Sequence, residues 1–222
     1  MIRNIEKRVV ETGLGRKHTY FYDAGKNAEY RRVVGGVAWP VANSLGFVCV
    51  LAENNSIDPR LKTRHYKILD EFESLDVDKI IKRLYDFQNR YLLTPWYGDR
   101  SNDMMGYLID QFNRGLGSKK KAIYIEEAPF AEDRHNLQLY ANQIKARTMA
   151  NKKSLFFGPD SKLPAALTGL TPDAVQTKAA QLFPPVAALG FALGGLDESY
   201  AEVFHDQELH DRYRSRMAVE GL

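Results

Sequence analysis

Cysteine is almost absent from this chain, and so are long apolar runs. The 222 residues include a single cysteine, Cys49, which excludes a disulfide within the chain and a zinc site built from several cysteines. No stretch approaches the ~18 consecutive apolar residues that a membrane-spanning helix needs, and the first residues lack the apolar core of a signal peptide. We therefore expect a cytoplasmic protein without a membrane segment.

Motifs that identify several enzyme classes are missing as well. The chain has no GxxxxGK[ST] phosphate-binding loop, no GxSxG or HExxH motif, and no EF-hand or dinucleotide-binding motif. The sequence therefore lacks the usual motifs of an ATPase motor, a serine hydrolase, a metalloprotease and a dehydrogenase. The net charge of +3 is too small to indicate a nucleic-acid partner by itself.

The residues that are present predict an ordinary globular protein with one large domain. Hydrophobic residues make up 44% of the chain and charged residues 27%. Three segments rich in β-branched and aromatic residues predict strands. These segments are residues 30–40, 45–53 and 65–73, and the apolar run around Cys49 in the second predicts a strand covered on both faces. The connection Val41–Ser44 has the length of a hairpin, so we expect an antiparallel start.

Helical and strand patterns alternate in the next part of the chain. Apolar residues at the helical period predict a first helix over residues 77–92, with Asp76 as its N-cap. The segments that follow are a strand at 94–97, a helix from 101 or 102 to 113, a strand at 121–126 and a helix at 134–151. The element order predicts an α/β fold with a mixed five-stranded sheet, three antiparallel strands then two parallel ones, and helices on both faces. This architecture resembles that of the ribonuclease H superfamily.

Asp99 is the first candidate for chemistry. It follows Gly98 at the end of the predicted fourth strand, just before a helix. In ribonuclease H-like nucleases, carboxylates from the first strand, the fourth strand and a helix hold two divalent ions, because Mg²⁺ and Mn²⁺ prefer oxygen ligands. The alternative is that Asp99 only satisfies backbone amides at a turn.

Two stretches are similar to the nuclease domain of the phage terminase large subunit, which cuts concatemeric viral DNA during packaging. Residues 31–40, RRVVGGVAWP, resemble the opening strand of that family, and residues 96–102, WYGDRSN, resemble its fourth strand. The resemblance implies a metal-dependent DNA endonuclease, with double-stranded DNA as the substrate and two Mg²⁺ or Mn²⁺ ions as the cofactor. It also implies an ATPase motor domain or other packaging proteins as partners, in the cytoplasm of a host cell.

The family's first-strand Asp falls on Ala38 in this sequence, and alanine offers no oxygen to a metal. Three interpretations stay open. The chain is a catalytically silent fold kept for binding or assembly, or Ala38 is an engineered inactivating substitution, or the register is wrong and another acid serves. Asp23 is the best rival for that role, although a turn residue beside Gly25 is the simpler interpretation.

The resemblance also assigns a third ligand to a helix, and Asp173 is the acid nearest that role. Asp173 and Pro172 equally suit a plain helix start. The basic residues most suggestive of contact with the DNA backbone are Lys145, Arg147, Lys152 and Lys153. Further acids at predicted strand ends are Asp70, Glu71, Glu126 and Glu127, for which solvated edge carboxylates are the alternative. The predicted organisation is an N-terminal segment at 1–29, a nuclease-like domain at 30–195 and a charged helical tail at 196–222.

Overall fold

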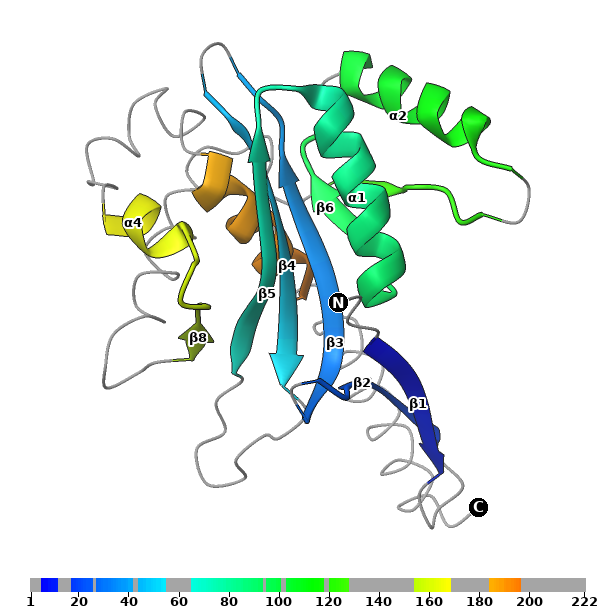
Figure 1. The fold of residues 1–222 in the computed structure, drawn as a ribbon, viewed down its shortest axis with the longest axis vertical. Coiled ribbons are helices and arrows are strands. Elements are labelled where there is room, and N and C mark those ends of the chain that lie inside the picture. The colour runs from blue at the N-terminus through cyan, green and yellow to red at the C-terminus, as the bar shows by residue number, and fades with distance from the viewer. Residues whose placement is uncertain are drawn as a thin grey trace, which may run out of the picture.

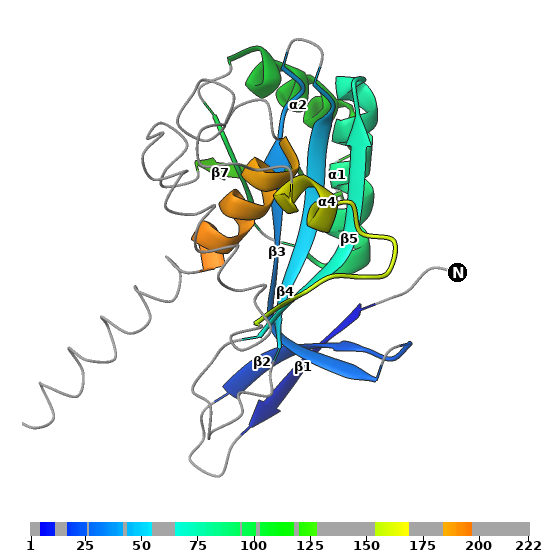
Figure 2. The same ribbon diagram turned by 90° about the vertical axis from the view of Figure 1, so that its left-hand side faces the viewer.

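The computed structural model has a long mixed sheet at its centre, with helices on both faces (Figures 1 and 2). The structure describes residues 5–11, 17–25, 27–41, 44–54, 65–93, 95–100, 103–117, 120–127, 154–168 and 184–196. The strands are β1 (Ile5–Glu11), β2 (Lys17–Asp23), β3 (Ala28–Ala38), β4 (Gly46–Asn54), β5 (Tyr66–Ser74), β6 (Trp96–Gly98), β7 (Ile125–Glu127) and β8 (Leu155–Phe156). The helices are α1 (Val77–Tyr91), α2 (Asp103–Gly115), α4 (Leu163–Thr168) and a helix over residues 184–196, drawn in orange. The predicted α/β class is confirmed.

β3 lies in the middle of the sheet, between strands that run in opposite directions. On one side, β4 and then β5 follow in antiparallel pairing. On the other side, β6 runs parallel to β3, and β7 runs parallel to β6. The spatial order across this part of the sheet is therefore β5-β4-β3-β6-β7.

The predicted count of five strands is wrong, because the described residues alone form a sheet of eight. β1 and β2 form a hairpin that extends from the body of the molecule, and β2 pairs with the first residues of β3 (Figure 2). β8 adds two residues parallel to β5. The sequence of β1 lacks the alternation of apolar and polar residues that is typical of a strand. Its contacts come from β2 across the hairpin, where the Arg8 guanidinium lies 3.8 Å from the centre of the Tyr22 ring. β8 is too short to leave a pattern in the sequence.

The two faces of the sheet bury different helices. Val33 and Val37 of β3 face α1, whereas Val34 and Ala38 face α4 and the 184–196 helix. Because residues 46–53 of β4 are all buried, the prediction that the strand around Cys49 is covered on both faces is confirmed. Burial also raises the pKa of the Cys49 thiol, which keeps it protonated and unreactive.

The 184–196 helix packs unusually close to β3. A Cβ atom added at Gly36 would lie 1.9 Å from the backbone oxygen of Ala188. Pro184 and Pro185 lie within this helix, at the start of its described part. Proline is favoured in the first turn of a helix, where no backbone donor is needed. The predicted helix at 134–151 and the tail beyond residue 196 lie outside the described residues.

A buried ion pair connects the end of this helix to the sheet. Arg32 Nη2 donates a hydrogen bond of 2.6 Å to the backbone oxygen of Leu196, and Arg32 Nε lies 3.1 Å from Glu53 Oε2. The Glu53 side chain is only 1% exposed, and that of Arg32 is 23% exposed. Arg32 therefore joins β3, β4 and Leu196, the last described residue of the 184–196 helix.

The helix predicted from residue 77 begins as the sequence indicates. Asp76 is its N-cap, and Asp76 Oδ1 accepts hydrogen bonds from the backbone N–H groups of Asp78 at 3.0 Å and Lys79 at 3.2 Å. Replacing Asp76 with alanine should lower the free energy of unfolding by about 1 kcal/mol, measured by urea denaturation. Asp78→Ala, which removes only a charge from the first turn, should cost a few tenths of a kcal/mol. Equal losses for the two variants would contradict this account of the cap.

Among the helices of the described residues, none combines the length and the hydropathy that a membrane crossing requires.

Candidate functional site

Ala38 and Asp99 lie side by side at the carboxyl ends of two neighbouring parallel strands. The register pairs Gly35 with Trp96, Gly36 with Tyr97 and Val37 with Gly98. Ala38 and Asp99 are the residues that directly follow the last of these pairs. Both line a small cavity of about 160 Å³ beneath the 184–196 helix. In open α/β sheets, ligands bind beyond the carboxyl ends of the strands, where the connections diverge. Here β3 turns back into β4 while β6 leads to α2.

Gly98, the last residue of β6, packs closely against Val37 of β3. A Cβ atom at that position would lie 2.9 Å from Val37 Cγ1 and 3.0 Å from the Val37 backbone oxygen. Directly after it, the backbone N–H of Arg100 donates a hydrogen bond of 2.7 Å to Glu127 Oε2. Glu127, predicted as a strand-end acid, thus fixes the chain where Asp99 leaves the sheet. Glu126 lies beside Tyr97 and is half-buried.

The helix that faces this cavity brings no carboxylate to it. Pro184, Ala187 and Phe191 of the 184–196 helix line the cavity together with Trp39 and Val41. Ala187 therefore occupies the helical position opposite Ala38 and Asp99. Sequence reasoning missed Ala187, because an alanine in an apolar helix carries no chemical signal. Asp173, the predicted third ligand, lies outside the described residues, as do Lys145, Arg147, Lys152 and Lys153.

The acids at the end of β5 serve as structural partners for other elements. Glu71 accepts hydrogen bonds from the Ser161 hydroxyl and, at 2.9 Å, from the Lys162 backbone N–H, and Glu73 pairs with the Lys162 ammonium. Glu73 shares a cross-strand row with Phe47, Ala38 and Asp99. At about 4.8 Å per strand, the row places Glu73 roughly 14 Å from Asp99, too far to share one ion with it.

Asp70 and Asp23 likewise have structural partners. Asp70 Oδ2 lies 3.0 Å from Arg90 Nη1 and accepts a hydrogen bond of 2.9 Å from the Tyr91 hydroxyl, which connects β5 to α1. Burial, together with the Asp70 charge, raises the pKa of Tyr91, so its hydroxyl stays a donor. Asp23 Oδ1 accepts a hydrogen bond of 3.0 Å from the Gly25 backbone N–H, as a turn residue does.

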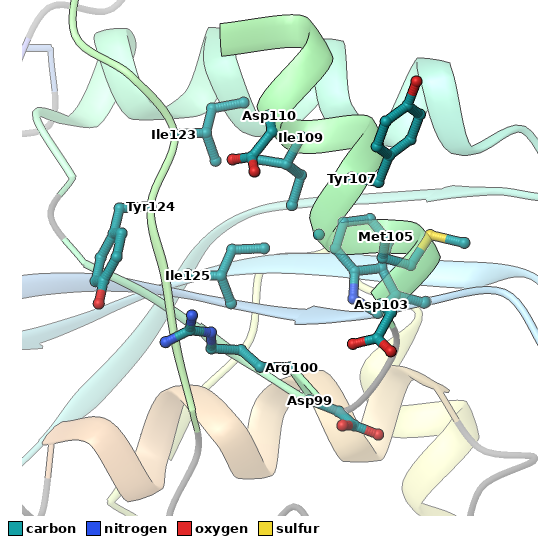
Figure 3. A pocket seen from close by; sticks show the side chains of 12 residues that line it. Asp99, Arg100, Asp103, Met105, Tyr107, Ile109, Asp110, Ile123, Tyr124 and Ile125 are labelled. Atoms are coloured by element: carbon teal, nitrogen blue, oxygen red, sulfur yellow. The ribbon is translucent and has the colours of Figure 1, made fainter.

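A larger cleft lies next to the small cavity, between α2 and β7 (Figure 3). Its volume is about 450 Å³, within the usual range for ligand pockets. Asp99 and Trp39 line both spaces. The acidic, basic and aromatic side chains that line only the larger cleft are Arg100, Asp103, Tyr107, Asp110 and Tyr124.

The residues around Asp99 do not fit the two ions that the resemblance implies. Among the described residues that line the small cavity, Asp99 is the single carboxylate, and the positions beside and opposite it are alanines 38 and 187. Two divalent ions need several oxygen ligands from the protein. Across the described part of the chain, no cluster of three or more His, Cys, Asp or Glu side chains has the geometry of a metal site.

Comparisons with known proteins add no relative: no family model, no curated protein and no solved structure matches this chain.

Proposed function

We propose that this chain is a ribonuclease H-like domain of the terminase nuclease type whose cutting site is silent. In that role it serves as a binding or assembly module of a DNA-packaging complex rather than as the endonuclease itself. The observation that carries the proposal is the pairing of β3 with β6, which brings Ala38 next to Asp99 under Ala187. Of the described residues at this place in the sheet, Asp99 contributes a carboxylate, and Ala38 and Ala187 contribute none.

The strand arrangement supports the ribonuclease H-like part of the proposal. In its favour is the order β5-β4-β3-β6-β7, with antiparallel pairing on one side of β3 and parallel pairing on the other. Helices cover both faces. The N-terminal hairpin and β8 are additions at the margins of this arrangement.

The donor set supports the silent part of the proposal. A two-ion mechanism depends on carboxylates that converge from two strands and a helix, and among the described residues that line this cavity only Asp99, directly after β6, carries one. Double-stranded DNA, an ATPase motor domain and other packaging proteins remain the proposed partners. The predicted DNA-contacting residues Lys145, Arg147, Lys152 and Lys153 belong to that proposal.

Restoring the missing acids tests both parts of the proposal. The native protein should not nick supercoiled plasmid in the presence of Mn²⁺, whereas the variant Ala38→Asp/Ala187→Asp should do so in a metal-dependent manner. Both alanines line the cavity, which gives the new carboxylates space beside Asp99. The three acids repel one another without a cation, so Mn²⁺ should also raise the Tm of the double variant by several degrees.

The matched control is Ala38→Asn/Ala187→Asn, which adds side chains of the same size without charge. It should neither cut DNA nor gain Tm from Mn²⁺, and Asp99→Asn should abolish both effects in the double Asp variant. Metal-dependent cutting by the native protein would refute the silent site. A folded double Asp variant that shows neither cutting nor a Tm shift would refute the ribonuclease H-like site.

A further inference from the structure

One edge of β7 is an open margin of the sheet. Among the strands of the described residues, β7 pairs only with β6, and the Trp96 backbone N–H donates a hydrogen bond of 3.3 Å to the Tyr124 backbone oxygen. Because successive residues of a strand direct their backbone groups to opposite edges, the N–H and C=O groups of Ile125 point away from β6. Within the described ranges, no hydrogen bond engages either group. Unpaired edges of this kind recruit a further strand.

A side chain of α2 closes the same edge two residues earlier and imitates a peptide group there. Asn113 Oδ1 accepts a hydrogen bond of 2.9 Å from the Ile123 backbone N–H, and Asn113 Nδ2 donates one of 2.9 Å to the Ile123 backbone oxygen. A residue of an antiparallel strand exchanges the same two bonds with the residue opposite it. The Asn113 carboxamide therefore lies where the peptide groups of a neighbouring strand would lie, and Ile125 is the next open position.

The cleft between α2 and β7 offers a site for an apolar side chain next to this position. Ile109 of α2 lines the cleft together with Ile123 and Ile125, and the three side chains point toward one another in Figure 3. Tyr124 projects from the opposite side of the strand. In an antiparallel pair, the side chains of two directly opposite residues lie on the same face of the sheet. A residue paired with Ile125 would therefore direct its side chain to the cleft, whose volume of about 450 Å³ has room for it.

From these contacts we propose that an extended segment of a partner protein binds antiparallel to β7 as a further strand of the sheet. Backbone hydrogen bonds to Ile125 contribute affinity, and an apolar side chain in the cleft gives specificity. Because Asn113 closes the edge at Ile123, the segment must end or turn away within two residues after the one that pairs with Ile125. The inference goes beyond the proposed function, since this edge lies outside the small cavity that Ala38 and Ala187 line.

Nuclear magnetic resonance of the full ¹⁵N-labelled chain tests this proposal through single amides. The probe is acetyl-Thr-Lys-Thr-Leu-Lys-amide, and the matched probe carries a methyl group on the leucine nitrogen. The first peptide should slow hydrogen exchange of the Ile125 amide at least about fivefold. It should leave the amide of Ile123, which Asn113 engages, and that of Glu126, which points toward β6, unchanged. The methylated peptide should bind at least about fivefold more weakly, because it lacks the donor to the Ile125 oxygen.

Variants of α2 test the apolar part of the site. Ile109→Thr makes the wall of the cleft more polar and should weaken binding of the first peptide about threefold. The matched control is Met104→Thr, at a position that is 61% exposed and does not line the cleft, and it should leave the affinity unchanged. A protein whose Tm shows it to be folded and that binds no peptide at about 1 mM would overturn the proposal.

Two further results would also overturn it. Equal binding of the methylated peptide would show that the backbone of β7 is not the docking element, as would slower exchange confined to amides other than that of Ile125. Protection of the Ile125 amide that rises with protein concentration in the absence of peptide would replace the partner protein with a second copy of this chain. None of these outcomes depends on the acids that the nicking assay restores.

Discussion

Replacing Gly36 with alanine should lower the free energy of unfolding by about 3 kcal/mol, the upper part of the range for an overpacked core. The new Cβ atom would lie 1.9 Å from the backbone oxygen of Ala188 and 2.9 Å from its carbonyl carbon. Backbone atoms of a packed helix cannot rotate away as a side chain can. The whole 184–196 helix must therefore move outward from β3, and the core beneath it loses contacts.

The matched control is Gly106→Ala, on the exposed side of α2. No atom lies within 4 Å of the Cβ position at Gly106, so alanine there should stabilise the protein by about 0.8 kcal/mol through helix propensity. The two Gly→Ala changes should thus have opposite signs in urea denaturation, with similar m-values. A stability of Gly36→Ala within 0.5 kcal/mol of the native protein, on the scale of a neutral surface change, would mean that the helix does not pack as closely as the structure shows.

Arg32→Met should be comparably damaging, with a loss of about 3 kcal/mol. It removes the guanidinium from Glu53, whose side chain is 1% exposed, and from the Leu196 backbone oxygen. A buried carboxylate that loses its cationic partner is far less stable than a solvated one. Native-state hydrogen exchange should quicken at the amides near Leu196 more than at those of α1, because Arg32 donates a hydrogen bond to the Leu196 backbone oxygen.

A double-mutant cycle separates the ion pair from the rest of this effect. Glu53→Gln keeps the shape of the side chain and removes its charge. The double variant Arg32→Met/Glu53→Gln should lose less free energy of unfolding than the two single variants together, by at least about 1 kcal/mol. In the Arg32→Met background the Glu53 carboxylate has lost the Arg32 guanidinium, so removing its charge there costs less. Strictly additive losses would show that Arg32 acts through the helix end alone.

The elements with strong local patterns were predictable from the sequence. The apolar run around Cys49 indicated a strand covered on both faces, and Asp76 marked the start of α1. The short strands were placed less well: the segment predicted at residues 121–126 is a strand only over Ile125–Glu127. β7 is a strand because it pairs with β6, which is only three residues long. The local sequence of β7 does not indicate which strand it pairs with.

The adjacency of Ala38 and Asp99 depends on the pairing of β3 with β6 and is not recorded in either local sequence. The role of Glu71 could not be read in the same way, since its partners Ser161 and Lys162 lie about 90 positions further along the chain. Ala187 enters the site only through the packing of a helix against β3, which depends on Gly36 and Ala188 rather than on Ala187 itself.

The hairpin of β1 and β2 changes what the sheet exposes to other molecules. Without it, the first residues of β3 would form an open edge beside a hydrophobic core, and such edges recruit strands from other chains. β2 covers that edge, which makes β1 the outermost strand of this part of the sheet. Four of its seven residues, Glu6, Lys7, Arg8 and Glu11, are charged and exposed. Charged side chains along an edge strand disfavour its pairing with strands of other molecules. The β1–β2 hairpin therefore also lowers the tendency of the protein to aggregate.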